Sequence, residues 1–316
     1  MDLSIVIPCF NEESLIEELL RRVIQAASET CPQSFEIIMV DDGSSDGTWE
    51  LIQKSVRCTP ELSGIKLSRN FGHQYALRAG LEYSKGNSVL IIDADLQDPP
   101  ELMKPMYDKL QSGYDVVYGL RKSREAETLF KKASAFAFYR ILEKLADVKI
   151  PKDTGDFRIM TRKVVDALLQ MPERDCFTRG MVSWLGFNQT PYEYERKARS
   201  CGETKYPLRK MLRLAADALL SFSSKPLRLC SLFGAASAIA SISLAAYIIV
   251  SYFLNKTVPG WASLGVIVTI FSSIQLFSIG LLGEYVSRIY VEGKRRPLYL
   301  VDTIEKHSSS PKGNLL

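Results

Sequence analysis

Residues 88–100 read SVLIIDADLQDPP, and this pattern is the clearest indication of the fold in the sequence. A short apolar run leads directly into two carboxylates, Asp93 and Asp95, and ends in two prolines, which cannot continue a central strand. Such a run, bounded by turn residues, is typical of a strand buried on both faces of a parallel sheet. We therefore expect a central strand at residues 88–92 with acidic residues at its carboxyl end.

The same pattern extends along the first 120 residues or so. Apolar runs at 3–7, 35–40, 64–67 and 115–118 alternate with helix-like segments at 12–29, 46–56, 74–84 and 100–112. This alternation predicts an α/β domain with a mainly parallel sheet that is covered by helices on both faces. Ligands of such sheets bind beyond the carboxyl ends of the strands, so the residues that follow each strand are the candidates for chemistry.

Several function classes are disfavoured by the sequence. The turn after the first strand, PCFNEE at 8–13, lacks the GxGxxG of dinucleotide-binding domains, and no P-loop occurs. The six cysteines are scattered and the two histidines, His73 and His307, lie far apart, so we expect no zinc site, a reduced compartment, and no special role for His73. A net charge of +4 is too small to indicate nucleic-acid binding.

Asp93 and Asp95 form the sharpest chemical signal. Side chains two residues apart project to the same side of extended backbone. Mg²⁺ and Mn²⁺ take oxygen ligands, and Mg²⁺ is typically held by one or two carboxylates together with substrate phosphates. The pair therefore predicts a divalent ion that holds a nucleotide diphosphate and neutralises charge on the leaving group.

Two uncharged stretches, 229–255 and 257–283, each exceed the roughly 20 residues that a helix needs to cross a bilayer. Lys and Arg residues flank their outer ends, which by the positive-inside rule places both termini in the cytoplasm. The apolar run at 3–7 is too short for the core of a signal peptide. We expect a multi-pass protein of the inner (cytoplasmic) membrane whose catalytic domain faces the cytoplasm.

The expected domains are a catalytic domain at 1–206, a juxtamembrane amphipathic helix at 207–228, a two-span transmembrane hairpin at 229–290 and a cytoplasmic tail at 291–316, frayed from about Asp302. Residues 129–145 are also amphipathic and suit either an interfacial helix or an ordinary packed helix.

Seven motifs together resemble one known family. They are IPCFNEE, VDDGSSDGT, LSRNFGHQYAL, IDADLQDPPEL, TGDFRIM, RSCGETKY and RRPLYLV, spread from about Leu3 to Val301. The chain resembles the family 2 glycosyltransferases that make polyprenyl-phosphate sugars, bactoprenol glucosyltransferases more than dolichyl-phosphate mannose synthases. The resemblance implies a GT-A fold, Mg²⁺ or Mn²⁺, inversion at the sugar carbon and a homo-oligomer. It also implies a nucleotide-diphosphate sugar as donor and polyprenyl (undecaprenyl) phosphate as acceptor, with UDP and glucose favoured and other sugars and GDP left open.

The resemblance also implies site residues. For the nucleotide sugar they are Pro8, Phe10, Glu12, Val40, Asp42, Asp93, Ala94, Gln97, Arg121, Arg199 and Lys205. The metal ligands are Asp93, Asp95 and Gln97, and the catalytic residues are Asp156 and Asp95. The family more often has Tyr where this chain has Phe10. The Phe ring can still stack, but a contact through the Tyr hydroxyl is lost. Because a lipid phosphate is already anionic near neutral pH, Asp156 acts either as a base or as a group that orients acceptor or sugar.

Three other functions fit the sequence less well. A processive polysaccharide synthase usually has a QxxRW motif and more spans, whereas no RW dipeptide occurs here. A non-catalytic membrane adaptor that binds nucleotide sugar has no need of Asp93, Asp95 and Asp156 together. A soluble nucleotidyltransferase is disfavoured by the expected hairpin.

Overall fold

A computed structural model describes residues 1–32, 34–121, 154–174, 176–195, 225–254 and 260–307. The chain divides into two compact units, which are described separately. Unit 1 comprises Met1–Tyr139, Val148–Tyr206 and Arg296–Leu316, and unit 2 comprises Arg140–Asp147 and Pro207–Arg295. The amphipathic segment expected at 129–145 and residues 207–224 of the expected juxtamembrane helix lie outside the described residues.

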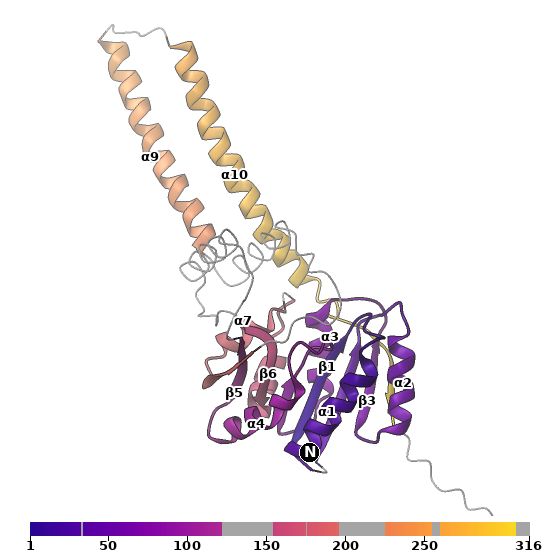
Figure 1. The fold of residues 1–316 in the computed structure, drawn as a ribbon. Helices are drawn as coiled ribbons and strands as arrows, with labels where there is room; N and C mark the ends of the chain where they lie inside the picture. Colours follow the sequence, from indigo (N-terminus) through magenta and orange to yellow (C-terminus); the bar gives the residue numbers. More distant parts are fainter. Residues whose placement is uncertain (33, 122–153, 175, 196–224, 255–259, 308–316) are drawn as a thin grey trace, which may run out of the picture. The chain divides into compact units, whose positions relative to one another are not determined.

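Unit 1 is built on an eight-stranded sheet with the order β7-β5-β6-β4-β1-β2-β3-β8 (Figure 1). The strands are β1 Leu3–Cys9, β2 Phe35–Asp41, β3 Leu62–Leu67, β4 Ser88–Ile91, β5 Val116–Arg121, β6 Thr154–Thr161, β7 Gln189–Tyr194 and β8 Val301–Lys306. Only β6 and β8 run against the other strands. The predicted mainly parallel sheet is therefore confirmed.

Helices cover both faces of this sheet, as predicted. They are α1 Ile16–Thr30, α2 Thr48–Cys58, α3 His73–Tyr83, α4 Met103–Gln111 after the short 3-10 helix η1 Pro100–Leu102, α6 Arg162–Leu169 and α7 Thr178–Trp184. Leu19 and Val23 of α1 lie one turn apart and are fully buried in the same apolar cluster as Ile5 and Ile37 of the sheet. Ala76 of α3 packs in a separate cluster with Val40.

The antiparallel direction of β6 positions the site. Because β6 runs against β4, its first residues lie at the edge where β4 ends. Ile91 pairs with Arg158. Extending this register by two residues brings Asp93 opposite Asp156, although the two are far apart in the sequence.

The expectation of a frayed end from about Asp302 is wrong for residues 302–306. These residues belong to β8, which pairs with the edge of β3. The preceding segment is also fixed, since Ser68 N donates to Leu300 O at 2.9 Å and the Tyr299 hydroxyl bonds Glu82. Half-buried and exposed residues alternate along β8. This alternation suits an edge strand that has one face against the protein and the other face in water.

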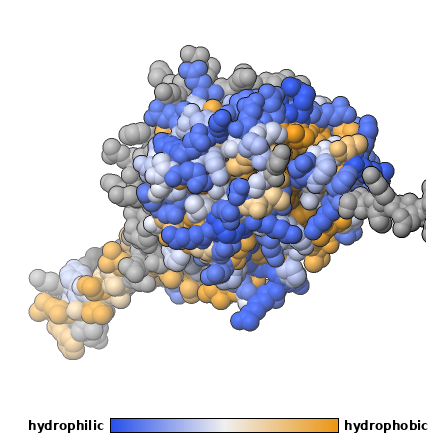
Figure 2. Space-filling model, turned by 90° about the horizontal axis from the view of Figure 1, so that it is seen from below, coloured by the Kyte–Doolittle hydropathy of each residue, from blue (hydrophilic) through white to orange (hydrophobic). Residues whose placement is uncertain are grey.

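Unit 2 contains two long helices, α9 Lys225–Phe253 and α10 Trp261–Gly293, which lie side by side (Figure 1). Exposed apolar side chains cover both, and their visible part is largely orange in Figure 2, whereas the visible face of unit 1 is mostly blue. Among the described residues, Val266–Gly293 is long and apolar enough to cross a membrane, and Leu232–Leu244 is a shorter apolar stretch. The span expected at 229–255, and with it the two-span hairpin, therefore stays a prediction.

Candidate active site

The loops after β1 and β2 are hydrogen-bonded to each other. Asn11 Oδ1 accepts the Ser45 N–H at 2.9 Å, and Asn11 N donates to Ser44 Oγ at 3.0 Å. Glu12 N donates to Thr48 Oγ1 at 2.9 Å. Two of the sequence motifs, FNEE and DDGSSDGT, thus form one rigid unit at the carboxyl edge of the sheet.

Asp42 fixes the loop between β3 and α3. Its carboxylate is buried and accepts the N–H groups of Phe71 at 2.8 Å and Gly72 at 2.9 Å. Burial raises the pKa of Asp42 even though both hydrogen bonds lower it. Gly43 has a φ of +67°, and a Cβ built there would lie 2.4 Å from the backbone carbon of Arg69. The two loops therefore approach each other too closely for any residue but glycine at this position.

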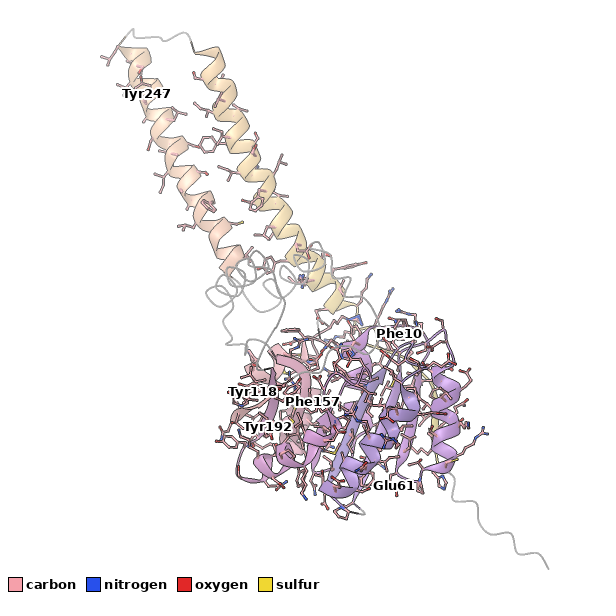
Figure 3. The ribbon with its side chains drawn as sticks, in the orientation of Figure 1. Phe10, Glu61, Tyr118, Phe157, Tyr192 and Tyr247 are labelled. Carbon is pink, nitrogen blue, oxygen red and sulfur yellow. The ribbon has the colours of Figure 1, made fainter. Side chains whose placement is uncertain are left out.

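The expected nucleoside-binding residues differ in what they expose. Phe10, which directly follows β1 and is labelled in Figure 3, is 45% exposed, so its ring is accessible for stacking. Pro8 and Val40 are buried partners on neighbouring strands. The Val40 side chain lies in the core against α3, so any contact with a nucleotide must involve its main chain. Glu12 is half-buried.

The acidic stretch after β4 forms a turn. The strand ends at Ile91, and the backbone reverses around Asp95 and Leu96, with a left-handed φ of 55° at Leu96. Asp95 Oδ1 accepts the Gln97 N–H at 3.0 Å, and both Ala94 and Gln97 are buried. The turn residues are Ala94 and Asp95, so the expected extended backbone is wrong at Asp95, whereas Ile92 and Asp93 lie between the strand and the turn. A left-handed non-glycine residue is costly and is often retained at functional sites.

Asp93 is the most electrostatically perturbed carboxylate of this turn. Its Oδ1 atom is buried without a hydrogen-bond partner, and His73 Nε2 lies 3.5 Å away. The pKa of Asp93 is raised to about 6: burial raises it most, the neighbouring carboxylates, Asp156 foremost, also raise it, and the His73 charge opposes them. Crowding of this kind disfavours ionisation unless a cation lies nearby.

The residues present suit a hard divalent ion. Asp93 and Asp95 supply carboxylate oxygens, and the unbonded Oδ1 of Asp93 leaves an acceptor for a cation. Within the described residues, no three Asp, Glu, His or Cys side chains form a ready-made metal cage.

Asp156 is surrounded by donors. It is 4% exposed, Gln74 Nε2 donates to its Oδ2 at 2.8 Å, and Arg179 Nε donates to its Oδ1 at 3.0 Å. His73 Nε2 lies 3.4 Å from Oδ2. Burial alone would raise the pKa of Asp156, but His73, Arg179 and the buried Arg158 outweigh it and hold this pKa well below its usual range. Asp156 is therefore a stable anion and a weak base.

Sequence reasoning misses four residues around Asp156. His73, for which no special role was expected, lies 3.5 Å from Asp93 and 3.4 Å from Asp156. Gln74, Arg158 and Arg179 were not expected at the site either. A signal existed for His73 and Gln74 in LSRNFGHQYAL and for Arg158 in TGDFRIM. Arg179 lies in none of the motifs.

The expected phosphate-binding residues cannot be placed by their side chains. Arg121 ends β5, but its side chain is not among those described. Arg199 and Lys205 lie outside the described residues. Their assignments stay predictions.

Comparison with known proteins gives two family matches. The model for glycosyl transferase family 2 matches residues 4–169, and the model for the GtrB C-terminal hairpin matches residues 225–289. The glycosyltransferase YkcC of Bacillus subtilis, itself uncharacterized, is 46% identical over 299 residues, covering 94% of this chain and 92% of the relative. Bactoprenol glucosyl transferase of Shigella phage SfV is 36% identical over 302 residues, covering 95% and 98%. Among solved structures, S. aureus TarS 1–349 matches with a TM-score of 0.46 and 20% identity, covering 71% of this chain and 66% of TarS.

Proposed function

This chain belongs to glycosyl transferase family 2, and we propose that it transfers one sugar from a nucleotide-diphosphate sugar to a polyprenyl phosphate. It is a glycosyltransferase with a GT-A-like fold. A relative covering nearly the whole chain is named for bactoprenol glucosyl transfer, which supports the lipid acceptor. We propose UDP-glucose as the donor and undecaprenyl phosphate as the acceptor. The observation that carries the proposal is the acidic turn at Asp93 opposite the buried Asp156.

The proposed reaction is a single displacement with inversion. A phosphate oxygen of the acceptor forms a bond to the anomeric carbon, while the bond from that carbon to the diphosphate oxygen breaks. The electron pair leaves with the nucleoside diphosphate. Because the acceptor oxygen is already anionic near neutral pH, no proton has to be removed from it.

The acidic turn is the proposed metal and diphosphate site. Asp93 and Asp95 would hold Mg²⁺ or Mn²⁺, and Gln97 lies in the same turn. A bound divalent ion supplies neutralisation of the charge that develops on the leaving diphosphate. The protein's own part is to fix the turn, through the bond from Gln97 N to Asp95 Oδ1.

Asp156 is proposed to orient rather than to deprotonate. A general base works best when its pKa lies near the operating pH, whereas the pKa of Asp156 lies below its usual range. Its bonds to Arg179 and Gln74 already occupy both oxygens. These facts favour an anion that holds cationic groups near the sugar and the acceptor phosphate.

The proposed site of action is the cytoplasmic face of the inner membrane. The match to the GtrB C-terminal hairpin and the apolar exposed surfaces of α9 and α10 support a two-span hairpin. Such a hairpin would keep the enzyme where a polyprenyl acceptor resides. A homo-oligomer is part of the same proposal.

The function is tested by supplying membranes that contain the protein with labelled nucleotide sugars, one at a time, and separating lipid products by thin-layer chromatography. We expect label from UDP-glucose in a polyprenyl-monophosphate glucose, and none with Asp95→Asn. Label in long polymer would favour a processive synthase. Donor binding without any product would favour an adaptor.

A further inference from the structure

Gln74, the second residue of α3, uses both ends of its side-chain amide. Its Nε2 donates to Asp156 Oδ2 at 2.8 Å. Its Oε1 accepts from Thr178 Oγ1 at 2.6 Å and from Thr178 N at 3.1 Å. One side chain therefore connects α3, the start of β6 and the start of α7.

These bonds close a ring. Thr178 is the first residue of α7, and the next residue, Arg179, donates to the other oxygen of Asp156 at 3.0 Å. The ring runs from Asp156 through Gln74 and Thr178 to Arg179 and back. Asp156 and Thr178 are each 4% exposed, so water has little access to replace a lost partner. Without Gln74, Oδ2 keeps only the more distant His73 Nε2, at 3.4 Å, and losing the closest donor to a buried carboxylate oxygen is costly.

We propose that Gln74 is a positioning residue for Asp156: it holds Oδ2 directly and, through Thr178, fixes the first turn of α7 so that Arg179 stays on Oδ1. The inference rests on the proposed function in placing Asp156 at the reacting centre. Groups at such a centre must be held to within about 0.5 Å, which requires support from neighbouring side chains.

The residue type follows from the two bonds. An amide presents a donor at one end and an acceptor at the other. Glutamate at position 74 would still accept from Thr178 but would place an acceptor against Asp156 Oδ2. Methionine would fill similar space and make neither bond.

The test compares Gln74→Met with Gln53→Met in the full-length protein. Gln53 is a matched control, because its Nε2 also donates to a carboxylate, that of Glu305, at 2.9 Å, between α2 and β8. We expect Gln74→Met to lower kcat at least about tenfold, with the donor KM within twofold and a Tm close to that of Gln53→Met. Equal kcat values for the two variants would overturn the inference.

Gln74→Glu is the second variant, nearly isosteric and hence useful if Gln74→Met does not fold. We expect it to lose kcat as well, since only the Thr178 side of the ring survives. A kcat like that of wild type would show that the bond to Asp156 is dispensable and would also overturn the inference. A different result would contradict the proposed function itself: wild-type protein would then transfer no sugar to polyprenyl phosphate.

Discussion

Arg179 Nε lies 3.0 Å from Asp156 Oδ1. The guanidinium of Arg179 is partly exposed, whereas the carboxylate of Asp156 is buried. Lysine keeps the charge but has no planar fork, so Arg179→Lys should release Oδ1 from its fixed position. We expect the rate of sugar transfer to fall at least about tenfold, with donor binding retained. Initial rates measured at saturating donor check this.

Arg22→Lys is the control for that substitution. Arg22 makes two bonds to Glu101, at 2.8 and 2.7 Å, on the outside of unit 1. We expect its transfer rate to match wild type. If Arg179→Lys also kept the wild-type rate, the pair with Asp156 would have no part in the reaction.

Asp95→Asn should remove metal binding while preserving the turn. The asparagine oxygen can still accept the Gln97 N–H, but the negative charge is lost. We expect transfer to fall to background and Mn²⁺ affinity, measured by electron paramagnetic resonance, to drop at least about tenfold. Membrane insertion should be unaltered. Unchanged Mn²⁺ affinity would remove Asp95 from the metal site.

The parallel part of the fold was predictable because it is local. The runs at 3–7, 35–40 and 88–92 are short, apolar and bounded by turn residues, and each is a strand with ends shifted by at most two residues. β8 escaped prediction because its alternating exposed residues, such as Asp302 and Lys306, are those of a polar tail. Its place depends on pairing with β3, far away in the sequence.

The site was predictable only where a motif carried it. Asp93, Asp95 and Asp156 stand in recognisable motifs, but that Asp93 lies opposite Asp156 follows from the antiparallel register of β6. His73 escaped prediction because the sequence shows it neither a nucleophile partner nor a second zinc ligand. Its location between two carboxylates depends on the long-range pairing of the sheet, which no local pattern specifies.

The buried carboxyl group of Asp41 should make the stability of the protein depend on pH. It is fully buried, its Oδ2 has no hydrogen-bond partner, and burial raises its pKa above the ordinary 3.8. The folded state thus binds the proton more tightly than the unfolded state, so the free energy of unfolding declines as pH rises above 3.8 and levels off above the folded pKa. Each unit of pKa difference is worth about 1.4 kcal/mol.

Asp41→Asn should abolish this contribution, because asparagine does not titrate. We expect the free energy of unfolding of the variant, relative to wild type, to increase from pH 4.5 to pH 7.5. Urea unfolding in detergent at both pH values measures the difference. Parallel pH dependences for the two proteins would contradict the prediction, whatever the offset between them.

Gly43→Ala should destabilise unit 1. A Cβ there would face both the positive φ and the backbone of Arg69 at 2.4 Å, so the loop held by Asp42 must move. We expect a loss of about 1–3 kcal/mol from strain, plus the cost of the clash. Gly113→Ala is the control, since Gly113 has a φ of +109° and a Cβ at that position would meet nothing within 4 Å. Equal losses in thermal unfolding would show that the close approach is unimportant.

Replacing residues 225–295 by a flexible linker should leave donor binding intact but impair access to the lipid acceptor. The design keeps β8, because removing everything from residue 225 onward would also strip the partner of β3 and destabilise the sheet. We expect the shortened protein to bind donor normally but to transfer sugar to polyprenyl phosphate in vesicles at least about tenfold more slowly. A short-chain, water-soluble acceptor should be used equally well by both proteins. Vesicle turnover equal to that of the full-length protein would mean that α9 and α10 do not bring enzyme and acceptor together.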